Sequence, residues 1–388
     1  MGNFDNVYNR KNTRSVKWDM LESVFQTNDV LPMWVADMDF KAPEAINEAI
    51  ANRAKHGIYG YTLTDEHVDE AIIRWLKKRH TWEIDRSWIT YSPGVVTSLL
   101  LAIQAFTKPG DQVLIQTPVY PPFANSITAH NRTVVTNSLV EKDNYYTIDF
   151  DDFEQKLTQG VKAFILCSPH NPVGRVWKKD ELEKMADLCV KHDVLIISDE
   201  IHCDLVFSGH THIPIASLSK EISQQTITCM SPSKTFNIAG LQASYVVIED
   251  QKKREVFGDH LSKQGISQLN TLGNIALEAA YMHGNEWLDE LIQVLEDHKD
   301  YVVKQLESDT SLKVTHTEGT YLLWVDCSSL NLSSDKLQAF MITEARVGLN
   351  AGYSYGEEGA SYMRINIACP KETLVEGINR IVEAVQTV

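Results

Sequence analysis

Between about residues 95 and 250, short apolar runs alternate with longer stretches in which apolar residues recur at helical spacing. The runs are rich in β-branched residues and too short for helices, so they predict strands, and 178–192 predicts a helix. The runs are DQVLIQT, VKAFILCS, VLIISD, QTITCMS and ASYVVI. This alternation is typical of an α/β fold with a mostly parallel sheet that is covered by helices on both faces.

The pattern changes after a long amphipathic region at 268–308. The apolar runs LKVTHT, TYLLWVD and SYMRINIA predict strands, and helices are predicted near 335–345 and 371–387, as in a smaller α+β domain. We expect an N-terminal segment at 1–45 that packs with the small domain, a large domain at 46–285 and the small domain at 286–388.

Composition limits the classes of function. The 388 residues are 43% hydrophobic and carry a net charge of -16, which favours neither nucleic acid nor anionic membranes as partners. No apolar signal core begins the chain and no run is long enough to span a membrane, so we expect a cytoplasmic protein. The six cysteines form no CxxC pair and are expected to be reduced core thiols.

In sheets of this kind, ligands bind where the strands end, and one lysine follows such a strand. Lys234 lies in SPSKTFNIAGLQ, among small, hydroxyl-bearing and apolar residues. A lysine is usually a solvated surface amine. Here the neighbours indicate a partly buried amine, whose pKa falls as hydration is lost. Such an amine attacks carbonyl groups and forms a Schiff base.

Two features indicate an anion site near this amine. Ser231 and Ser233 flank Lys234 with hydroxyl groups, and Gly94 precedes an apolar helix that begins at Val95 and Val96. The free N–H groups at a helix N-terminus hold phosphate, although glycine is also common in plain turns. Together with the lysine, these residues favour a phosphate-bearing aldehyde as ligand.

Three other strand ends carry candidate side chains, each with a structural alternative. Asp199 ends VLIISD and serves either as a helix N-cap or as the partner of a protonated heteroaromatic nitrogen. Tyr120 offers a flat ring for stacking. Asn171 offers a hydrogen bond to a phenolate oxygen, or marks an Asn-Pro turn.

The ordered set resembles the fold type I pyridoxal-phosphate enzymes of the class I/II aminotransferase superfamily over almost the whole chain. The set is Gly94, Tyr120, Asn171, Asp199, Ser231, Lys234 and, in SYMRINIA, Arg364. The resemblance implies a seven-stranded, mostly parallel sheet, pyridoxal 5'-phosphate as cofactor and Lys234 as the lysine that bonds it. It also implies Asp199 as the partner of the pyridinium nitrogen, Tyr120 as the stacking ring and Arg364 as the clamp for the substrate carboxylate.

Two departures from the aminotransferase pattern narrow the resemblance. His202 stands three residues after Asp199, where a tyrosine is usual, and Gln242 stands eight residues after Lys234, where an arginine is usual. With LPMWVADMDF and SDEIHCDL, the chain is similar to the PatB/MalY-type cysteine-S-conjugate β-lyases. That branch implies a homodimer with shared active sites, in which Tyr61 reaches the phosphate of the neighbouring subunit. His202 is expected either near the cofactor ring or as an ordinary buried histidine.

The activity that the resemblance implies is β-elimination from cysteine S-conjugates, which yields a thiol, pyruvate and ammonia. Lys234 would act as the general base, while Arg364, Asn171 and Tyr61 would contact the substrate. An aminotransferase, or a cofactor-binding regulator with lyase side activity, remains an alternative.

Two further patterns are weaker. His210 and His212 in SGHTHIPI lie two residues apart, but no carboxylate or cysteine is seen to complete a metal site, so we expect ordinary loop histidines and no metal. Trp34, Asp37 and Asp39 in WVADMDF either line the substrate entrance or form a polar turn.

Overall fold

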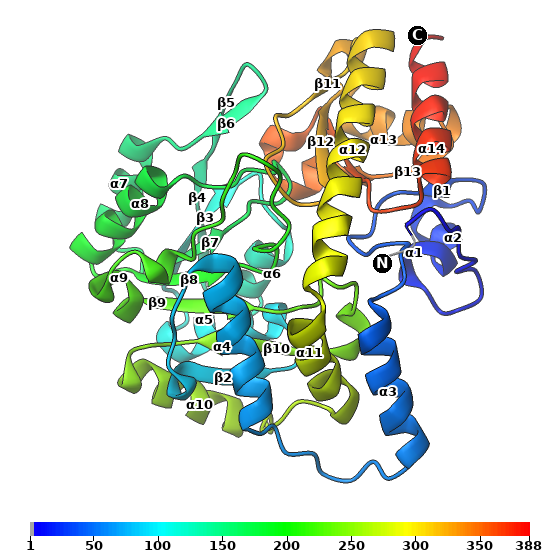
Figure 1. The fold of residues 1–388 in the computed structure, drawn as a ribbon. Helices are drawn as coiled ribbons and strands as arrows, with labels where there is room; N and C mark the ends of the chain where they lie inside the picture. The colour runs from blue at the N-terminus through cyan, green and yellow to red at the C-terminus, as the bar shows by residue number, and fades with distance from the viewer. Residues whose placement is uncertain (1–3) are drawn as a thin grey trace.

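The computed structural model describes residues 4–388 and has a seven-stranded sheet at its centre (Figure 1). The strand order is β2 (Ile89–Ser92), β10 (Ser244–Val247), β9 (Thr226–Met230), β8 (Leu195–Asp199), β7 (Ala163–Cys167), β3 (Gln112–Thr117) and β4 (Thr133–Ser138). Only β10 runs against its neighbours in this sheet; the pairs from β9 to β4 are all parallel. The predicted α/β fold with a mostly parallel sheet is confirmed.

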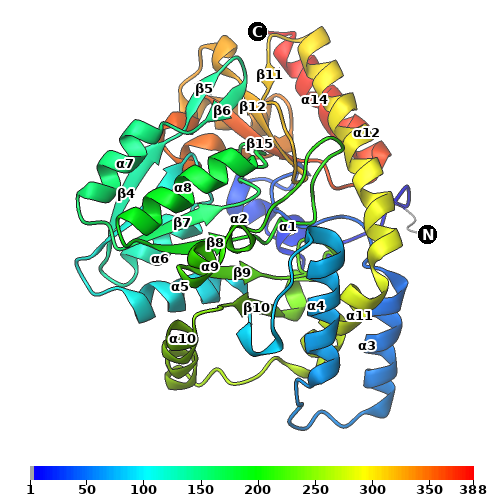
Figure 2. The same cartoon turned by 60° about the vertical axis from the view of Figure 1, so that its left-hand side comes forward.

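Helices cover both faces of this sheet, as Figures 1 and 2 show. One face packs against α5 (Val95–Phe106), α6 (Pro122–Thr128) and α10 (Gln251–Lys263), the other against α7 (Phe150–Thr158), α8 (Lys179–Lys191) and α9 (Lys220–Gln224). Successive residues of β7 pack on opposite faces of the sheet. Ile165 belongs to the core under α5, α6 and α10, while Phe164 and Leu166 belong to the core under α7, α8 and α9. Burial on both faces explains why this strand is continuously apolar.

A group of helices continues the fold beside β10. α11 (Thr271–His283) packs against α3 (Glu44–His56) and α4 (Glu66–His80), and the segment that joins α3 to α4 lies at the foot of the molecule (Figures 1 and 2). α12 (Asn285–Asp309) then leads up to a second sheet. The amphipathic region predicted at 268–308 is therefore two helices. No helix within residues 4–388 is long and apolar enough to cross a membrane.

The second sheet is antiparallel throughout, with the order β11 (Lys313–Val314), β12 (Leu322–Asp326), β15 (Tyr362–Asn366) and β14 (Asn350–Ala351). The helices α13 (Ser334–Thr343) and α14 (Lys371–Val385) lie close to the predicted positions. Near the N-terminus, α1 (Val16–Asp19) and α2 (Leu21–Phe25) precede β1 (Leu31–Pro32), which pairs with β13 (Val347–Gly348). Residues 1–3 of the predicted N-terminal segment lie outside the described part.

Seven strands had no signal in the apolar pattern: the two-residue strands β1, β13 and β14, and four longer ones. β2 and β4 belong to the large sheet, and the hairpin β5 (Val140–Lys142) and β6 (Tyr145–Thr147) stands apart from it. β2 and β4 are partly exposed edge strands, and every residue of β5 is exposed. These strands mix polar and apolar residues because little of their surface is buried, so hydrophobic runs do not reveal them.

Candidate active site

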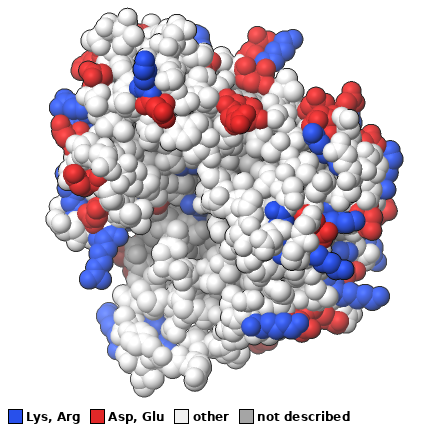
Figure 3. Space-filling model, turned by 180° about the vertical axis from the view of Figure 1, so that it is seen from behind, with Lys and Arg blue, Asp and Glu red and all other residues white. Residues whose placement is uncertain are grey.

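A cavity lies at the carboxyl ends of the central strands of the large sheet. Its volume is about 290 Å³, enough for a small ligand. Ten of the predicted site residues line it: Gly94, Val95, Val96, Tyr120, Asn171, Asp199, His202, Ser231, Ser233 and Lys234. A second cavity shares Tyr120 and Lys234 with the first and adds Arg364. Figure 3 shows a hollow in the face seen from behind, with basic atoms inside it.

Lys234 follows β9 and is half-buried beside the cavity. Its Nζ donates to the carbonyl oxygen of Ala36 at 2.7 Å, and among residues 4–388 it forms no ion pair with a carboxylate. Burial, and secondarily the charge of Arg364, lower its pKa from 10.5 to about 8. An amine of this kind is neutral in a useful fraction of molecules near neutral pH and is therefore a competent nucleophile or base.

Asp199 ends β8 and is buried. Its Oδ1 accepts a hydrogen bond from Ile201 N at 3.1 Å, and no other donor to this carboxylate occurs in the described chain. Burial raises its pKa to about 7. A buried carboxylate with so few partners is unfavourable when ionised, which suits a site that receives a cationic ligand.

The N-terminus of α5 forms the part of the cavity wall that can bind an anion. α5 begins at Val95, after Gly94, and no side chain caps its N-terminus, so its first N–H groups face the cavity lined by Gly94, Val95 and Val96. Ser231 is less free than predicted, because its hydroxyl donates to Ala243 O at 2.7 Å and accepts from Ser233 N at 3.1 Å.

Arg364 comes from β15 in the second sheet and is buried beside the same cavity. One Nη donates to Asn171 Oδ1 at 3.1 Å and the other to Trp34 O at 2.8 Å, while its Nε is buried without a partner. The guanidinium lies over the ring of Tyr355. A fixed guanidinium with an unused donor is suited to bind a carboxylate.

Tyr120 and His202 complete the lining. Burial, then the charge of Asp199, raise the pKa of Tyr120. Burial, then the charge of Lys234, lower the pKa of His202 to about 3, so this imidazole is neutral. Its Nδ1 has no hydrogen-bond partner and its ring meets Tyr321 edge-on. His202 is therefore a buried histidine that lines the cavity.

The segment WVADMDF, residues 34–40, crosses the site as a strap. Besides the bonds to Lys234 and Arg364, its carbonyls at Val35 and Asp37 accept from Asn366 Nδ2, each at 2.6 Å. Trp34 lines the second cavity, but Asp37 and Asp39 do not line either one. They pair with Arg10 and Lys17 instead, so of the two alternatives the structure favours a polar turn for these two carboxylates and not the entrance.

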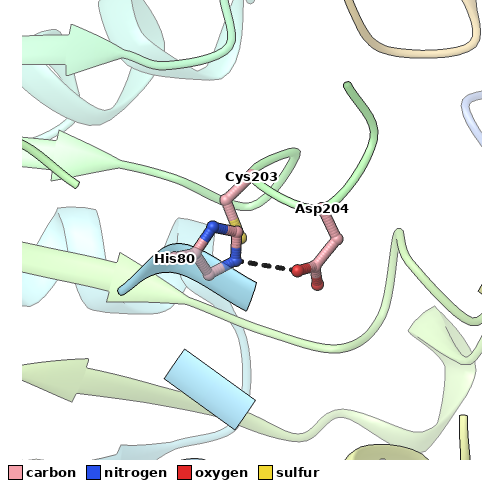
Figure 4. A group of neighbouring side chains, drawn as sticks. All are labelled: His80, Cys203 and Asp204. Carbon is pink, nitrogen blue, oxygen red and sulfur yellow. Dashed lines mark hydrogen bonds and ion pairs between the residues drawn. The ribbon is translucent and has the colours of Figure 1, made fainter. Parts of the chain in front are cut away.

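A hydrogen-bonded cluster around Asp204 contacts the turn that carries Lys234, and Figure 4 shows its bond between His80 and Asp204. Asp204 accepts from His80 at 2.8 Å, from Trp75 Nε1 at 3.1 Å and from Thr235 Oγ1 at 2.8 Å. Burial would raise the pKa of Asp204, but these donors outweigh it and the pKa is lowered. Since Thr235 follows Lys234, the cluster holds the turn that carries the amine.

The expectation that no carboxylate accompanies the loop histidines is wrong. His212 Nε2 lies 2.9 Å from Glu200 Oε2, and His210 Nδ1 lies 3.8 Å from Glu318 Oε1. The two histidines point to different partners and do not act as a pair. Local sequence did not reveal the pairing of His210, because Glu318 lies more than 100 residues further along the chain.

Tyr61 is the one predicted site residue that the chain does not bring to the cavity. It lies between α3 and α4 and is 106% exposed relative to a reference tyrosine. Residues that line the site and were missed include Thr97, in the first turn of α5, and Tyr355. The hydroxyl of Thr97 beside the Gly94 motif was a readable signal, whereas nothing local marked Tyr355.

Comparison with known proteins identifies the class that this fold and site define. Residues 28–381 match the family Aminotransferase class I and II, and the chain belongs to that family. It is 47% identical over 381 residues to cystathionine β-lyase PatB of Bacillus subtilis, which covers 98% of each chain.

Solved structures agree with this relationship. Cystalysin from Treponema denticola, a structure that contains pyridoxal 5'-phosphate, superimposes with a TM-score of 0.97 at 38% identity, covering 100% of this chain and 99% of the other. The C-S lyase from Staphylococcus hominis, bound to the same cofactor, gives 0.92 at 33% identity, with 99% and 98% covered. The resemblance drawn from the sequence motifs is confirmed.

Proposed function

We infer that this protein is a pyridoxal-phosphate-dependent carbon–sulfur lyase that releases a thiol, pyruvate and ammonia from cysteine S-conjugates. The observation that carries this function is the Lys234 amine, whose pKa is lowered to about 8 by burial, set in one cavity with Asp199 and the N-terminus of α5. The relatives named as cystathionine β-lyase and C-S lyase support the reaction class.

The residues present fit the cofactor. A cationic ring nitrogen would stabilise the ionised form of the buried Asp199 carboxylate, and the uncapped N-terminus of α5 offers N–H groups for a phosphate. We assign the phosphate to Gly94, Val95, Val96 and Ser233, and the ring to the space between Tyr120 and Asp199. Ser231 supports this end through Ser233 N, and His202 and Asn171 line the ring region.

Bound pyridoxal phosphate supplies an electron sink for the negative charge that develops at the substrate Cα. Lys234 takes the Cα proton, and its bond to Ala36 O keeps Nζ oriented in the cavity. Arg364 and Asn171 hold the substrate carboxylate and so fix which Cα bond faces Lys234. The thiolate leaves without strong acid assistance because free thiols have a pKa of about 8.5.

The reaction products distinguish this function from transamination. Purified protein with pyridoxal phosphate and an S-alkyl cysteine, without added keto acid, should form pyruvate and free thiol in equal amounts through many turnovers. A single turnover that resumes only when a keto acid is added would identify an aminotransferase instead. A protein that binds the cofactor but turns over neither way would be a regulator.

We also propose that the protein is a homodimer with shared active sites. The segment between α3 and α4 exposes four large apolar residues: Ile58, Tyr59, Tyr61 and Leu63. Such a cluster is a typical contact for a second copy, and the face in Figure 3 is largely uncharged around the hollow. In the dimer Tyr61 would reach the phosphate and the substrate of the neighbouring subunit, and the mass in solution tests the assembly.

Two broader assignments complete the proposal. We propose the division into an N-terminal segment at 1–45, a large domain at 46–285 and a small domain at 286–388, because the two sheets fall into the latter two parts. We propose the cytoplasm as location, because all six cysteines are free and buried, as in reducing compartments.

A further inference from the structure

Within residues 4–388, two groups of three side chains have the composition of a metal site. The first is His80, Cys203 and Asp204. Its carboxylate already accepts three hydrogen bonds, and burial raises the pKa of the Cys203 thiol well above its ordinary value. Figure 4 shows the bond between His80 and Asp204, so this imidazole and this carboxylate are already engaged. The second group is His210, His316 and Glu318, which we call the 210/316/318 cluster.

The 210/316/318 cluster joins two segments that are distant in sequence. His210 lies in the loop after β8, while His316 and Glu318 lie in the connection between β11 and β12. One ligand atom from each residue falls within 4.8 Å of the others, and His210 Nδ1 is 3.8 Å from Glu318 Oε1. Ligand atoms around a tetrahedral ion lie about 3.3 Å apart at normal bond lengths, so small side-chain rotations close the site.

Glu318 is oriented as a metal-binding carboxylate should be. Its Oε2 accepts from Arg175 Nε at 2.9 Å and from Val176 N at 2.8 Å, which leaves Oε1 turned to His210. Oε1 also accepts from Tyr145 OH at 3.1 Å and retains a second lone pair. The charge of Arg175 is shared with Glu181, at 2.7 Å, so it does not exclude a cation. Outer partners of this kind are typical of bound carboxylates.

The two imidazoles are accessible and uncommitted. The side chain of His210 is 30% exposed and His316 is exposed, whereas Glu318 is buried. In the described chain neither imidazole makes a hydrogen bond, apart from the long contact of His210 with Glu318. An ion held here would keep one side open to water, as at sites with three protein ligands.

We propose that His210, His316 and Glu318 form a binding site for a divalent transition-metal ion of the Zn²⁺ or Ni²⁺ class, separate from the lyase cavity. Two imidazoles and one carboxylate favour these ions over Ca²⁺ and Mg²⁺, which prefer oxygen ligands alone. The ion would tie the loop after β8 to the connection between β11 and β12.

Zinc binding to the cofactor-loaded, untagged protein tests the site. Equilibrium dialysis against Zn²⁺ should give one ion per chain that His316→Ala weakens at least about tenfold, because one of three ligands is lost. The matched control is His67→Ala, an exposed histidine on α4, which should bind as the unchanged protein does. The melting temperature should rise with zinc in the unchanged protein and the control, but not in His316→Ala.

A second variant keeps the test independent of folding. His210→Ala removes a ligand without breaking the Arg175–Glu318 pair, and it should lose zinc as His316→Ala does while thiol release without zinc stays unchanged. Equal zinc binding by all the proteins, loss only in His67→Ala, or no binding below about millimolar zinc would each overturn the proposal.

Discussion

Lys17 and Lys234 are both shielded from bulk water, and they differ in whether a carboxylate is paired with the amine. Lys17 in α1 is 1% exposed and pairs with Asp39 at 2.6 Å, with Asp37 at 3.8 Å. Lys234 has only the carbonyl of Ala36, and burial lowers its pKa to about 8. Lys17 stabilises the fold because the nearby carboxylates compensate for its lost hydration. Lys234 has no such partner within residues 4–388, so burial favours its neutral form and makes the amine a better nucleophile.

The two lysines are connected through the strap of residues 34–40, which each of them contacts. Lys17 holds the carboxylate of Asp39, and Lys234 donates to the carbonyl of Ala36 three residues earlier. Burial would raise the pKa of Asp39, but Lys17 and the indole of Trp18 outweigh it, so the pKa is lowered and the carboxylate is ionised. The structural pair therefore positions the backbone that orients the reactive amine.

The largest effect is expected from Lys234→Ala. Thiol release should fall by about 10² to 10⁴-fold, because the group that moves the Cα proton is gone. The visible absorption of bound pyridoxal phosphate should also be lost. The matched control is Lys304→Ala, an exposed lysine on α12, which should keep both the absorption and the turnover. Normal thiol release by Lys234→Ala would refute the catalytic assignment.

Lys17→Met should act on stability. Removing one partner of a buried ion pair costs about 3 to 5 kcal/mol, and we expect the lower end because Arg10 and Trp18 still bond Asp39. Urea unfolding followed by circular dichroism measures the change, with the exposed Lys11→Met as control. An unchanged free energy of unfolding would show that the ion pair of Lys17 does not stabilise the fold, and that Lys17 and Lys234 do not differ as described above.

The smallest effect concerns pH. In cofactor-free protein, the rate at which pyridoxal phosphate is captured should rise with pH with a midpoint near 8 and level off above it, because only neutral Lys234 reacts and its pKa is about 8. The charge of Arg364 contributes to that low pKa, so Arg364→Gln should move the midpoint to higher pH and slow capture near neutral pH by less than about tenfold. Stopped-flow absorbance gives the profile. A midpoint above pH 10 in the unchanged protein would show an ordinary solvated lysine.

The strand ends explain why so much of the site was predictable. In a parallel sheet these ends meet at one edge, so Asp199, Tyr120, Asn171 and Lys234 converge once the apolar runs are recognised as strands. The uncapped N-terminus of α5 at Gly94 was predictable because a glycine before an apolar helix has no side-chain oxygen to cap the first N–H groups. Their roles toward the cofactor stay predictions.

Other parts of the site depend on contacts that no local pattern records. The sequence allowed Asp37 and Asp39 to be entrance residues, but in the structure they form ion pairs with Arg10 and Lys17. Glu318 lies beside His210 only because the loop after β8 meets the connection between β11 and β12.

The sequence alone determined the fold class, the cofactor and the position of the lysine beside the cavity. Hydrophobic spacing and the order of a few polar residues were sufficient, because each of them is a property of short segments. Tertiary structure alone decided which buried charges are paired. An ion pair needs two side chains within about 4 Å, and that separation is set by how distant segments pack rather than by the residues on either side of each charge.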